Sequence, residues 1–274
     1  MRRFAALLLA ARLAGCAPPV PPAPQAPAVP QRIVSLDYCA DQFVLKLADR
    51  AQIAALSTSA ASGFSYMRTS AAGLPQVRAR AEDVLGLRPD LVVRSYGGEA
   101  NIAGLLARAR TPLAQLAYGE DFEAVRGNIR AMAAAFGHPQ RGEALVAEMD
   151  ARLAAIQPGG KRTALYVTPA GFTTGPGSLV DALLRAAGLE NFETAPGWRP
   201  LPLERLAGER PDMVAAGFFN THTTAADSWS SMRHPIALRQ MRERPVVHLD
   251  GAWIACGGWF LVDAAEALAA GGGP

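Results

Sequence analysis

The 274-residue chain is short of the residues on which metal and nucleophile chemistry depends. It has four histidines and three cysteines, and no two histidines lie close together in the sequence. Carriers of bare zinc or manganese hold the ion with clustered histidines and carboxylates, so we do not expect a carrier of this kind. The G-x-S-x-G turn and the G-x-G-x-x-G loop are missing too. Ser35, His222 and Asp250 supply the residue types of a triad, but scattered residues of these types do not predict an enzyme.

An excess of one charge and a long apolar run are also missing. The 27 basic residues are nearly balanced by 24 acidic ones, which gives a net charge of +3, and the two signs are interspersed. Nucleic-acid-binding proteins carry a basic patch or stripe, so we expect no nucleic-acid partner. The apolar run FAALLLAARLA at 4–14 is too short to span a bilayer.

The N-terminus resembles that of an exported protein. A basic start, MRR, precedes the apolar run, and LAGC ends it at Cys16. This order is typical of a secretory signal, and LAGC is similar to the bacterial lipobox, whose cysteine is lipidated. We assign 1–16 to a signal peptide with a lipobox and predict a periplasmic protein with a lipid anchor in a membrane. Arg12 and nearby A-x-A-type cleavage sites leave open a periplasmic protein that is simply cleaved.

A proline-rich linker follows at 17–31, because proline at this density forms extended segments and no core. Beyond it only Cys39 and Cys256 remain as unmodified cysteines. Two thiols in an oxidising compartment often pair. A disulfide, two buried free thiols and a shared metal site all remain open, since the sequence does not give the distance between them.

The rest of the chain alternates between strand and helix patterns. RIVSL, QIAALS and LVVRS are short apolar runs rich in β-branched residues, and helical periodicity follows the first and third of them. Asp37 precedes the first helix as an N-cap. Residues 121–157 have helical patterns only, and alternation resumes at TALYV. We therefore predict an α/β protein of two lobes, each with a mainly parallel sheet flanked by helices.

One phrase occurs in both halves. AEDVLGLRPDLVV at 81–93 and LERLAGERPDMVA at 203–215 each place a glutamate at the same distance before Pro-Asp. This repeat supports an N-terminal lobe at 32–137, a connecting helix at 138–160 and a C-terminal lobe at 161–270. Two lobes form a cleft, and clefts between domains are where ligands bind.

A set of segments carries a family resemblance: RIVSLDYCADQ, both repeated phrases, TTGPGSLVDALLRAAGLENF and the RPVVHLD…WFLVDAAEAL end. Over about 32–270 the chain in this way resembles the substrate-binding proteins of bacterial ABC importers for ferric siderophores, haem and cobalamin. The resemblance implies a monomer that binds a small-molecule metal chelate between its lobes, performs no chemistry, needs no cofactor, and docks on a permease dimer driven by an ATPase. It also gives the repeated glutamates, Glu82 and Glu204, a role in docking on permease arginines, whose planar fork suits carboxylates.

The ligand should lie at the carboxyl ends of the strands, as in open α/β sheets generally. Aromatic side chains there offer a large contact area, and arginines suit anionic chelates. Arg94 and Tyr96 are the strongest candidates, because Gly97-Gly98 opens the backbone beside them. The candidate ligand-binding residues are Tyr38, Tyr66, Arg68, Arg78, Arg94, Tyr96, Phe172, Trp198, Phe218, Trp229 and Trp253.

The number of arginines favours a ferric siderophore. Cobalamin is largely neutral outside its core and would need fewer of them. Haem carriers of the family use a tyrosine as iron ligand, and Tyr66 could serve although it lies well before Glu82. The alternative of another class is a lipoprotein of the same fold without a transport function.

Overall fold

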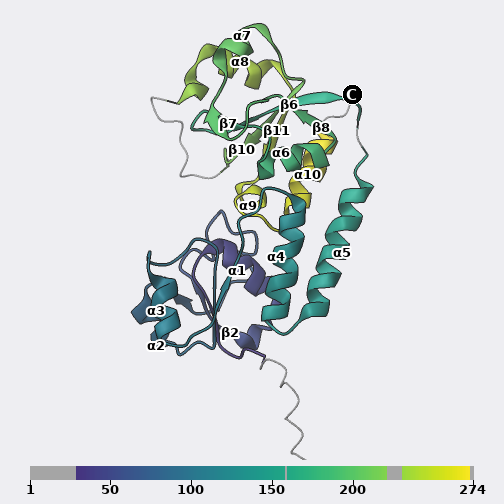
Figure 1. Ribbon diagram of the computed structural model, residues 1–274. Coiled ribbons are helices and arrows are strands. Elements are labelled where there is room, and N and C mark those ends of the chain that lie inside the picture. Colours follow the sequence, from purple (N-terminus) through teal and green to yellow (C-terminus); the bar gives the residue numbers. More distant parts are fainter. Residues whose placement is uncertain (1–28, 158, 221–229, 272–274) are drawn as a thin grey trace, which may run out of the picture.

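The computed structural model describes residues 29–157, 159–220 and 230–271, so the expected signal peptide, Cys16, His222 and Trp229 lie outside the described residues. Two α/β lobes are joined by a pair of long helices (Figure 1). Among the described residues, no helix combines the length and the apolar composition that crossing a membrane would require.

The N-terminal lobe is built on a parallel sheet of five strands in the order β3-β2-β1-β4-β5. Apolar residues of α2 and α3 cover one face, while α1 and α4 pack against the other. The expected N-cap is confirmed, since the Asp37 carboxylate accepts from the Ala40 amide at 2.9 Å. The elements of this lobe are β1 (Ile33–Ser35), α1 (Tyr38–Leu47), a 3₁₀ turn (Arg50–Gln52), β2 (Ile53–Ser57), β3 (Gln76–Val77), α2 (Ala81–Gly86), β4 (Leu91–Arg94), α3 (Ile102–Arg108) and β5 (Leu113–Gln115).

The C-terminal lobe repeats this plan with a parallel sheet in the order β11-β10-β6-β8. A small antiparallel pair, β7 and β9, lies beside it and was not predicted from the sequence. The elements are β6 (Arg162–Val167), β7 (Phe172–Thr174), α6 (Leu179–Ala186), β8 (Leu189–Asn191), β9 (Trp198–Pro200), α7 (Leu203–Gly208), β10 (Met213–Gly217), a 3₁₀ turn (Ser231–Arg233), α8 (Pro235–Glu243), β11 (Val246–Leu249), α9 (Gly251–Ile254) and α10 (Leu261–Ala270).

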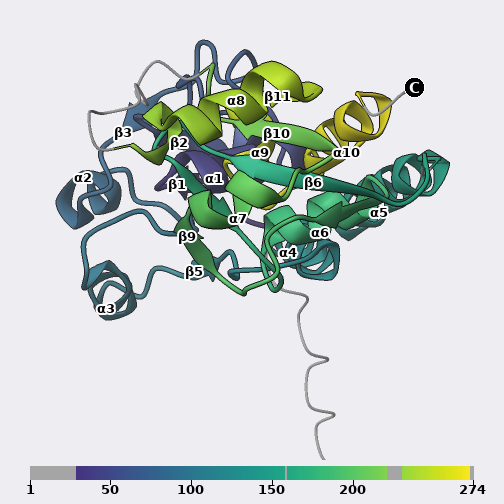
Figure 2. The same cartoon turned by 90° about the horizontal axis from the view of Figure 1, so that it is seen from above.

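Two antiparallel helices run between the lobes, in the segment 121–157 for which the sequence predicted helices only; the second of them is the predicted connecting helix. These are α4 (Phe122–Ala135) and α5 (Pro139–Ala155), and α5 forms the edge of the molecule opposite α2 and α3 (Figure 2). The apolar positions Leu145, Val146 and Met149 of α5 are buried, as its one-sided pattern predicts. A continuous hydrophobic core runs through α1, α4, α5, α6 and α10 and thus joins both lobes.

The aspartates of the repeated phrase explain why it occurs twice. Asp90 accepts the backbone N–H groups of Gln31 and Arg32 at 2.7 and 2.9 Å, just before β1. Asp212 accepts the Thr163 N–H at 2.6 Å in β6. Each aspartate therefore fixes the start of the strand that pairs with its own, β1 beside β4 and β6 beside β10. The aspartate of the phrase thus aligns two parallel strands, once in each lobe.

Cys39 and Cys256 form a disulfide, which resolves the alternatives left open by the sequence. Cys39 lies in α1 of the N-terminal lobe, and Cys256 follows α9 of the C-terminal lobe. The bond therefore links the two lobes covalently across the cleft. Beneath it, the Phe43 ring meets the Trp259 ring edge-on at 5.7 Å.

We predict that replacing both cysteines by serine lowers the free energy of unfolding by about 2–5 kcal/mol, because the bridge closes a long loop and restricts the unfolded chain. Thermal unfolding followed by circular dichroism measures the loss. Wild-type protein treated with a thiol reductant is the matched control and should unfold like the double variant. Equal melting temperatures for oxidised and reduced wild type, with two titratable thiols in the untreated protein, would show that the bridge is absent.

Candidate ligand-binding site

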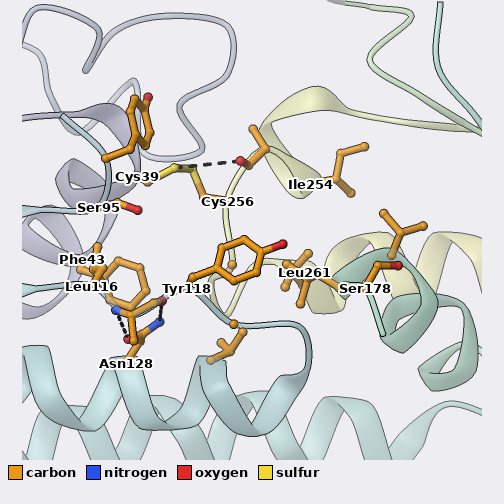
Figure 3. A pocket seen from close by; sticks show the side chains of 18 of the residues that line it. Cys39, Phe43, Ser95, Leu116, Tyr118, Asn128, Ser178, Ile254, Cys256 and Leu261 are labelled. Carbon is orange, nitrogen blue, oxygen red and sulfur yellow. Dashed lines mark hydrogen bonds between the residues drawn. A yellow bond between two sulfur atoms is a disulfide. The ribbon is translucent and has the colours of Figure 1, made fainter. Parts of the chain in front are cut away.

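A cavity of about 480 Å³ lies between the lobes (Figure 3). Both lobes and the connecting helix α4 contribute to its wall, and none of the described residues that line it carries a charged side chain. Such concave, mostly apolar sites with a few polar groups are typical of small-molecule binding. The lining residues are Cys39, Phe43, Ser95, Tyr96, Gln115, Leu116, Ala117, Tyr118, Gly119, Val125, Asn128, Ser178, Leu179, Val180, Leu183, Trp198, Ile254, Ala255, Cys256, Gly257 and Leu261.

Tyr96 lies on a turn that Asp37 holds in place. One oxygen of the Asp37 carboxylate accepts the backbone N–H groups of Ser95, Tyr96 and Gly97 at 2.7, 3.1 and 2.9 Å. A Cβ on Gly97 would lie 2.4 Å from the Leu36 carbonyl oxygen, so only glycine fits. The N-cap of α1 thus also fixes the turn after β4 that carries Tyr96 into the cavity wall. Desolvation, followed by the nearby Tyr38, raises the pKa of the Tyr96 hydroxyl well above its usual value, which keeps it neutral.

A second tyrosine, Tyr118, comes from the segment between β5 and α4. Its side chain is 86 % exposed, and Figure 3 shows its ring reaching across the cavity toward Leu261 and Ser178. Asn128 of α4 holds this segment, because its amide group donates to the Ala117 carbonyl and accepts from the Ala117 N–H, both at 2.9 Å. The sequence analysis missed Tyr118 and Asn128. The position of Tyr118 just beyond a strand end was the available signal.

The two tyrosine-bearing segments are tied to each other. The Gln115 amide donates to the Ser95 carbonyl at 2.6 Å and to the Leu116 carbonyl at 2.9 Å. Asp37, Gln115 and Asn128 together fix the N-terminal-lobe wall through hydrogen bonds to the backbone. This wall is therefore preorganised, and Tyr96 and Tyr118 are among its lining residues.

A row of aromatic rings crosses between the lobes beside Tyr96. The Tyr38 ring lies 5.8 Å from that of Tyr96 and 6.0 Å from that of Phe64. Phe64 in turn lies 6.1 Å from Phe218 of the C-terminal lobe. Tyr38 therefore stands next to the cavity wall and Phe218 at the far end of the row, and neither is a lining residue.

Tyr66 does not reach the cavity and forms part of a contact between the lobes. Its hydroxyl donates to the Asp263 carboxylate at 2.7 Å, and its ring stacks on Phe260 at 4.7 Å. Burial and the hydrogen bond to Asp263 raise the pKa of Tyr66 to about 12. Arg152 of α5 also binds Asp263, at 2.6 Å. Tyr66 is thus engaged in holding the lobes together, and the structure does not support it as an iron ligand.

The candidate arginines also lie outside the cavity wall. Arg68 donates to the Ser65 carbonyl at 3.2 Å, and the exposed Arg78 pairs with Asp83 at 3.0 Å. Arg94 is partly buried at the end of β4. Of the remaining candidates, Trp198 lines the cavity, whereas Phe172 and Trp253 do not. The structure therefore places Tyr96 and Trp198 in the wall of one cavity, whereas the candidate arginines are not among its lining residues.

Glu82 and Glu204 occupy matching places in the two lobes. Each is exposed and lies in the first turn of its helix, α2 or α7. Neither forms an ion pair with any other described residue, in contrast to Asp83 beside Glu82. Both carboxylates are therefore available to a partner.

Two α/β lobes, a connecting helical pair and a neutral cavity between the lobes define a two-lobed small-molecule-binding protein. A family model described as periplasmic binding protein matches residues 33–228. The chain therefore belongs to the periplasmic binding protein family, whose members bind their ligands and are not enzymes.

Solved structures and curated proteins that are similar to this chain include binding proteins for heme and cobalamin. A periplasmic heme-binding protein from Roseiflexus sp. RS-1 superposes with a TM-score of 0.70 at 24 % identity, over 89 % of this chain and 99 % of that one. One from Pseudomonas aeruginosa gives 0.69 at 26 % identity, over 88 % and 92 %. A cobalamin-binding protein of Halobacterium salinarum is 26 % identical over 199 residues, 69 % of this chain and 54 % of the relative. The chain thus spans about half the length of the curated relatives it matches.

We predict that Asn128→Leu raises the dissociation constant of the bound ligand roughly 3–10-fold. The segment that carries Tyr118 loses two hydrogen bonds of about 1 kcal/mol each, and water replaces them only in part. Gln140→Leu, at an exposed position of α5, is the matched amide-to-leucine control and should leave the affinity unchanged. Fluorescence titration gives the constants, and thermal unfolding shows that both variants fold. Equal affinity of Asn128→Leu and wild type would exclude a positioning role.

Proposed function

We propose that the chain is the substrate-binding component of an ABC importer, which captures a metal-containing macrocycle between its lobes and delivers it to a membrane permease. The observation that carries this proposal is the neutral, aromatic cavity between two lobes that are fixed to each other. Aromatic rings offer a flat macrocycle a large contact area at low entropic cost. We place the protein in the periplasm, with the lipid anchor at Cys16 as part of the proposal.

A corrinoid such as cobalamin is the ligand we favour. Among the described residues no cation lines the cavity, so they offer no ionic partner for the carboxylates or catecholates of a siderophore. The number of arginines in the sequence therefore does not support a siderophore at this wall. A corrinoid is largely neutral at its periphery and is recognised through amide groups. Ser95, Gln115 and Ser178 place hydroxyl and amide groups on the wall for such contacts. The cobalamin-binding relatives support this choice.

Haem is the second candidate, on account of Tyr118. Its phenol projects into the cavity and is the kind of oxygen ligand that ferric haem accepts. The solved heme-binding relatives support it. The neutral wall counts against haem, because its two propionates would find no cation among the lining residues.

Titration of the purified protein with cyanocobalamin, haemin and a panel of ferric siderophores tests the proposal. We expect tight quenching of tryptophan fluorescence by cyanocobalamin, because Trp198 lines the cavity. If haemin binds instead, its visible spectrum should show a tyrosinate-ligated ferric haem that Tyr118→Phe abolishes. Tight binding of a siderophore alone would overturn the macrocycle proposal. A folded protein that binds none of them would favour a lipoprotein without a transport function.

Delivery would use Glu82 and Glu204 as a two-point dock for arginines of a permease dimer. The lobes are related by the same helix–Pro-Asp–strand unit, so the two carboxylates are presented in the same local geometry. Arginine binds a carboxylate through two parallel hydrogen bonds, which fixes orientation as well as adding attraction. An ATPase partner would then drive release from the docked, monomeric protein.

We predict that Glu82→Arg with Glu204→Arg abolishes uptake of the ligand by cells and leaves its binding in solution within about twofold of wild type, because like charges would face each other at both docking points. Radiolabelled-ligand uptake and fluorescence titration measure the two effects. Glu148→Arg, at an exposed site on α5, is the matched charge reversal and should not affect uptake. Normal uptake by the double variant would exclude this dock.

A further inference from the structure

The C-terminal lobe buries a hydroxyl group that lacks a partner. Tyr166 in β6 is 1 % exposed, and its hydroxyl makes no hydrogen bond within the part of the chain that the structure describes. Burial raises the pKa of Tyr166 above its usual value, so the group is a neutral phenol that can donate. Buried polar groups are nearly always paired, and each exception calls for an explanation.

This hydroxyl lies directly behind the wall of the ligand cavity. The Tyr166 ring meets the Trp198 ring edge-on at 6.0 Å. A Cβ added to Gly217 would lie 2.5 Å from the Tyr166 oxygen and 2.8 Å from Ile254 Cδ1, so the oxygen and the Ile254 side chain share one small space. Trp198 and Ile254 both line the cavity. One layer of side chains therefore separates the phenol from a bound ligand.

A second unpartnered hydroxyl belongs to the same region. Thr174 in β7 is 0 % exposed, and its Oγ1 has no hydrogen-bond partner among the described residues. Thr174 and Trp198 are directly opposite each other in the β7–β9 pair. Opposite residues of an antiparallel pair point to the same face. Thr174 therefore lies on the face from which Trp198 contacts Tyr166.

The covering side chain is the one best able to move. Trp198 is 55 % exposed, although its inner edge rests on Tyr166. An exposed ring on a short edge pair can change its rotamer without disturbing the core, whereas Ile254 is packed against the main hydrophobic cluster. A turn of the Trp198 ring would open the phenol to the cavity.

We propose that Tyr166, with Thr174 beside it, forms a hydrogen-bonding subsite that Trp198 covers in the free protein and uncovers for the ligand. The subsite would donate to a carbonyl or carboxylate oxygen at the periphery of the bound macrocycle. An amide of a corrinoid and a propionate of haem both offer such an oxygen. The proposal rests on the proposed function, since it assigns a contact within the same cleft.

Tyr166→Phe tests the subsite, because it removes the hydroxyl and keeps the ring. We expect the dissociation constant for cyanocobalamin or haemin, whichever binds wild type, to rise about tenfold, the effect of losing one hydrogen bond. We expect the melting temperature of the free protein to stay the same or to rise, because no hydrogen bond is lost and an unpaired buried group is removed.

Thr163→Val is the matched control. It removes a hydroxyl that donates to the Asp212 carboxylate at 3.0 Å near the start of β6, outside the cavity, so this variant should lose stability and keep its affinity. The two hydroxyl deletions are thus expected to show opposite effects.

Three outcomes would overturn the subsite. The first is an unchanged affinity of Tyr166→Phe for a ligand that wild type binds. If the melting temperature of this variant is also lowered, the hydroxyl makes a purely structural hydrogen bond. Tighter binding by Tyr166→Phe would show that the phenol opposes the ligand. Failure of wild type to bind either macrocycle would overturn the proposed function, and the subsite with it, and this result is distinct from any effect of the substitution.

Discussion

The contact between α1 and the C-terminal segment is the constraint on which the site depends. The Cys39–Cys256 bond joins them covalently, and Phe43 packs on Trp259 beside it. The Tyr66–Asp263 hydrogen bond adds a further contact on the same side of the cleft. Together with the paired helices α4 and α5, these contacts set the distance between the cavity walls. Large hinge closure would have to break them, so the ligand should meet a cleft whose width is already fixed.

The repeated phrase is both a folding signal and a clue to function, and the two are carried by different residues. Asp90 and Asp212 align neighbouring strands, which is a structural need of any parallel sheet. Glu82 and Glu204 satisfy no such need, since both are exposed and unpaired among the described residues. The aspartates would be expected in either lobe of an unrelated α/β protein. The glutamates lie in the first turns of their helices, where an acidic side chain also favours the helix dipole, and we propose for them a surface role common to both lobes.

Much of the fold followed from the sequence because its signals are local. The Asp37 N-cap, the buried strand Leu91–Arg94 and the one-sided helix Pro139–Ala155 each depend on a few consecutive residues. The β7–β9 pair was not predictable, because three-residue strands have no periodicity and their partners lie far apart in the sequence. The cavity wall was predicted in part: residue type suggested arginines, but only the tertiary structure shows that Arg68 and Arg78 face other residues, and that Asn128 positions Tyr118.

A neutral wall on a fixed cleft implies selection by shape and hydrogen bonding. Among the described residues none that lines the cavity is charged, so a charged group of the ligand would find no ionic partner on this wall and would lose hydration on entry. Preorganisation lowers the cost of binding, because few groups have to be ordered. Backbone-anchored turns supply that order for Tyr96 and Tyr118. Among the described residues no such anchor holds the Trp198 ring, which is therefore the place where we propose that the wall adapts to the ligand.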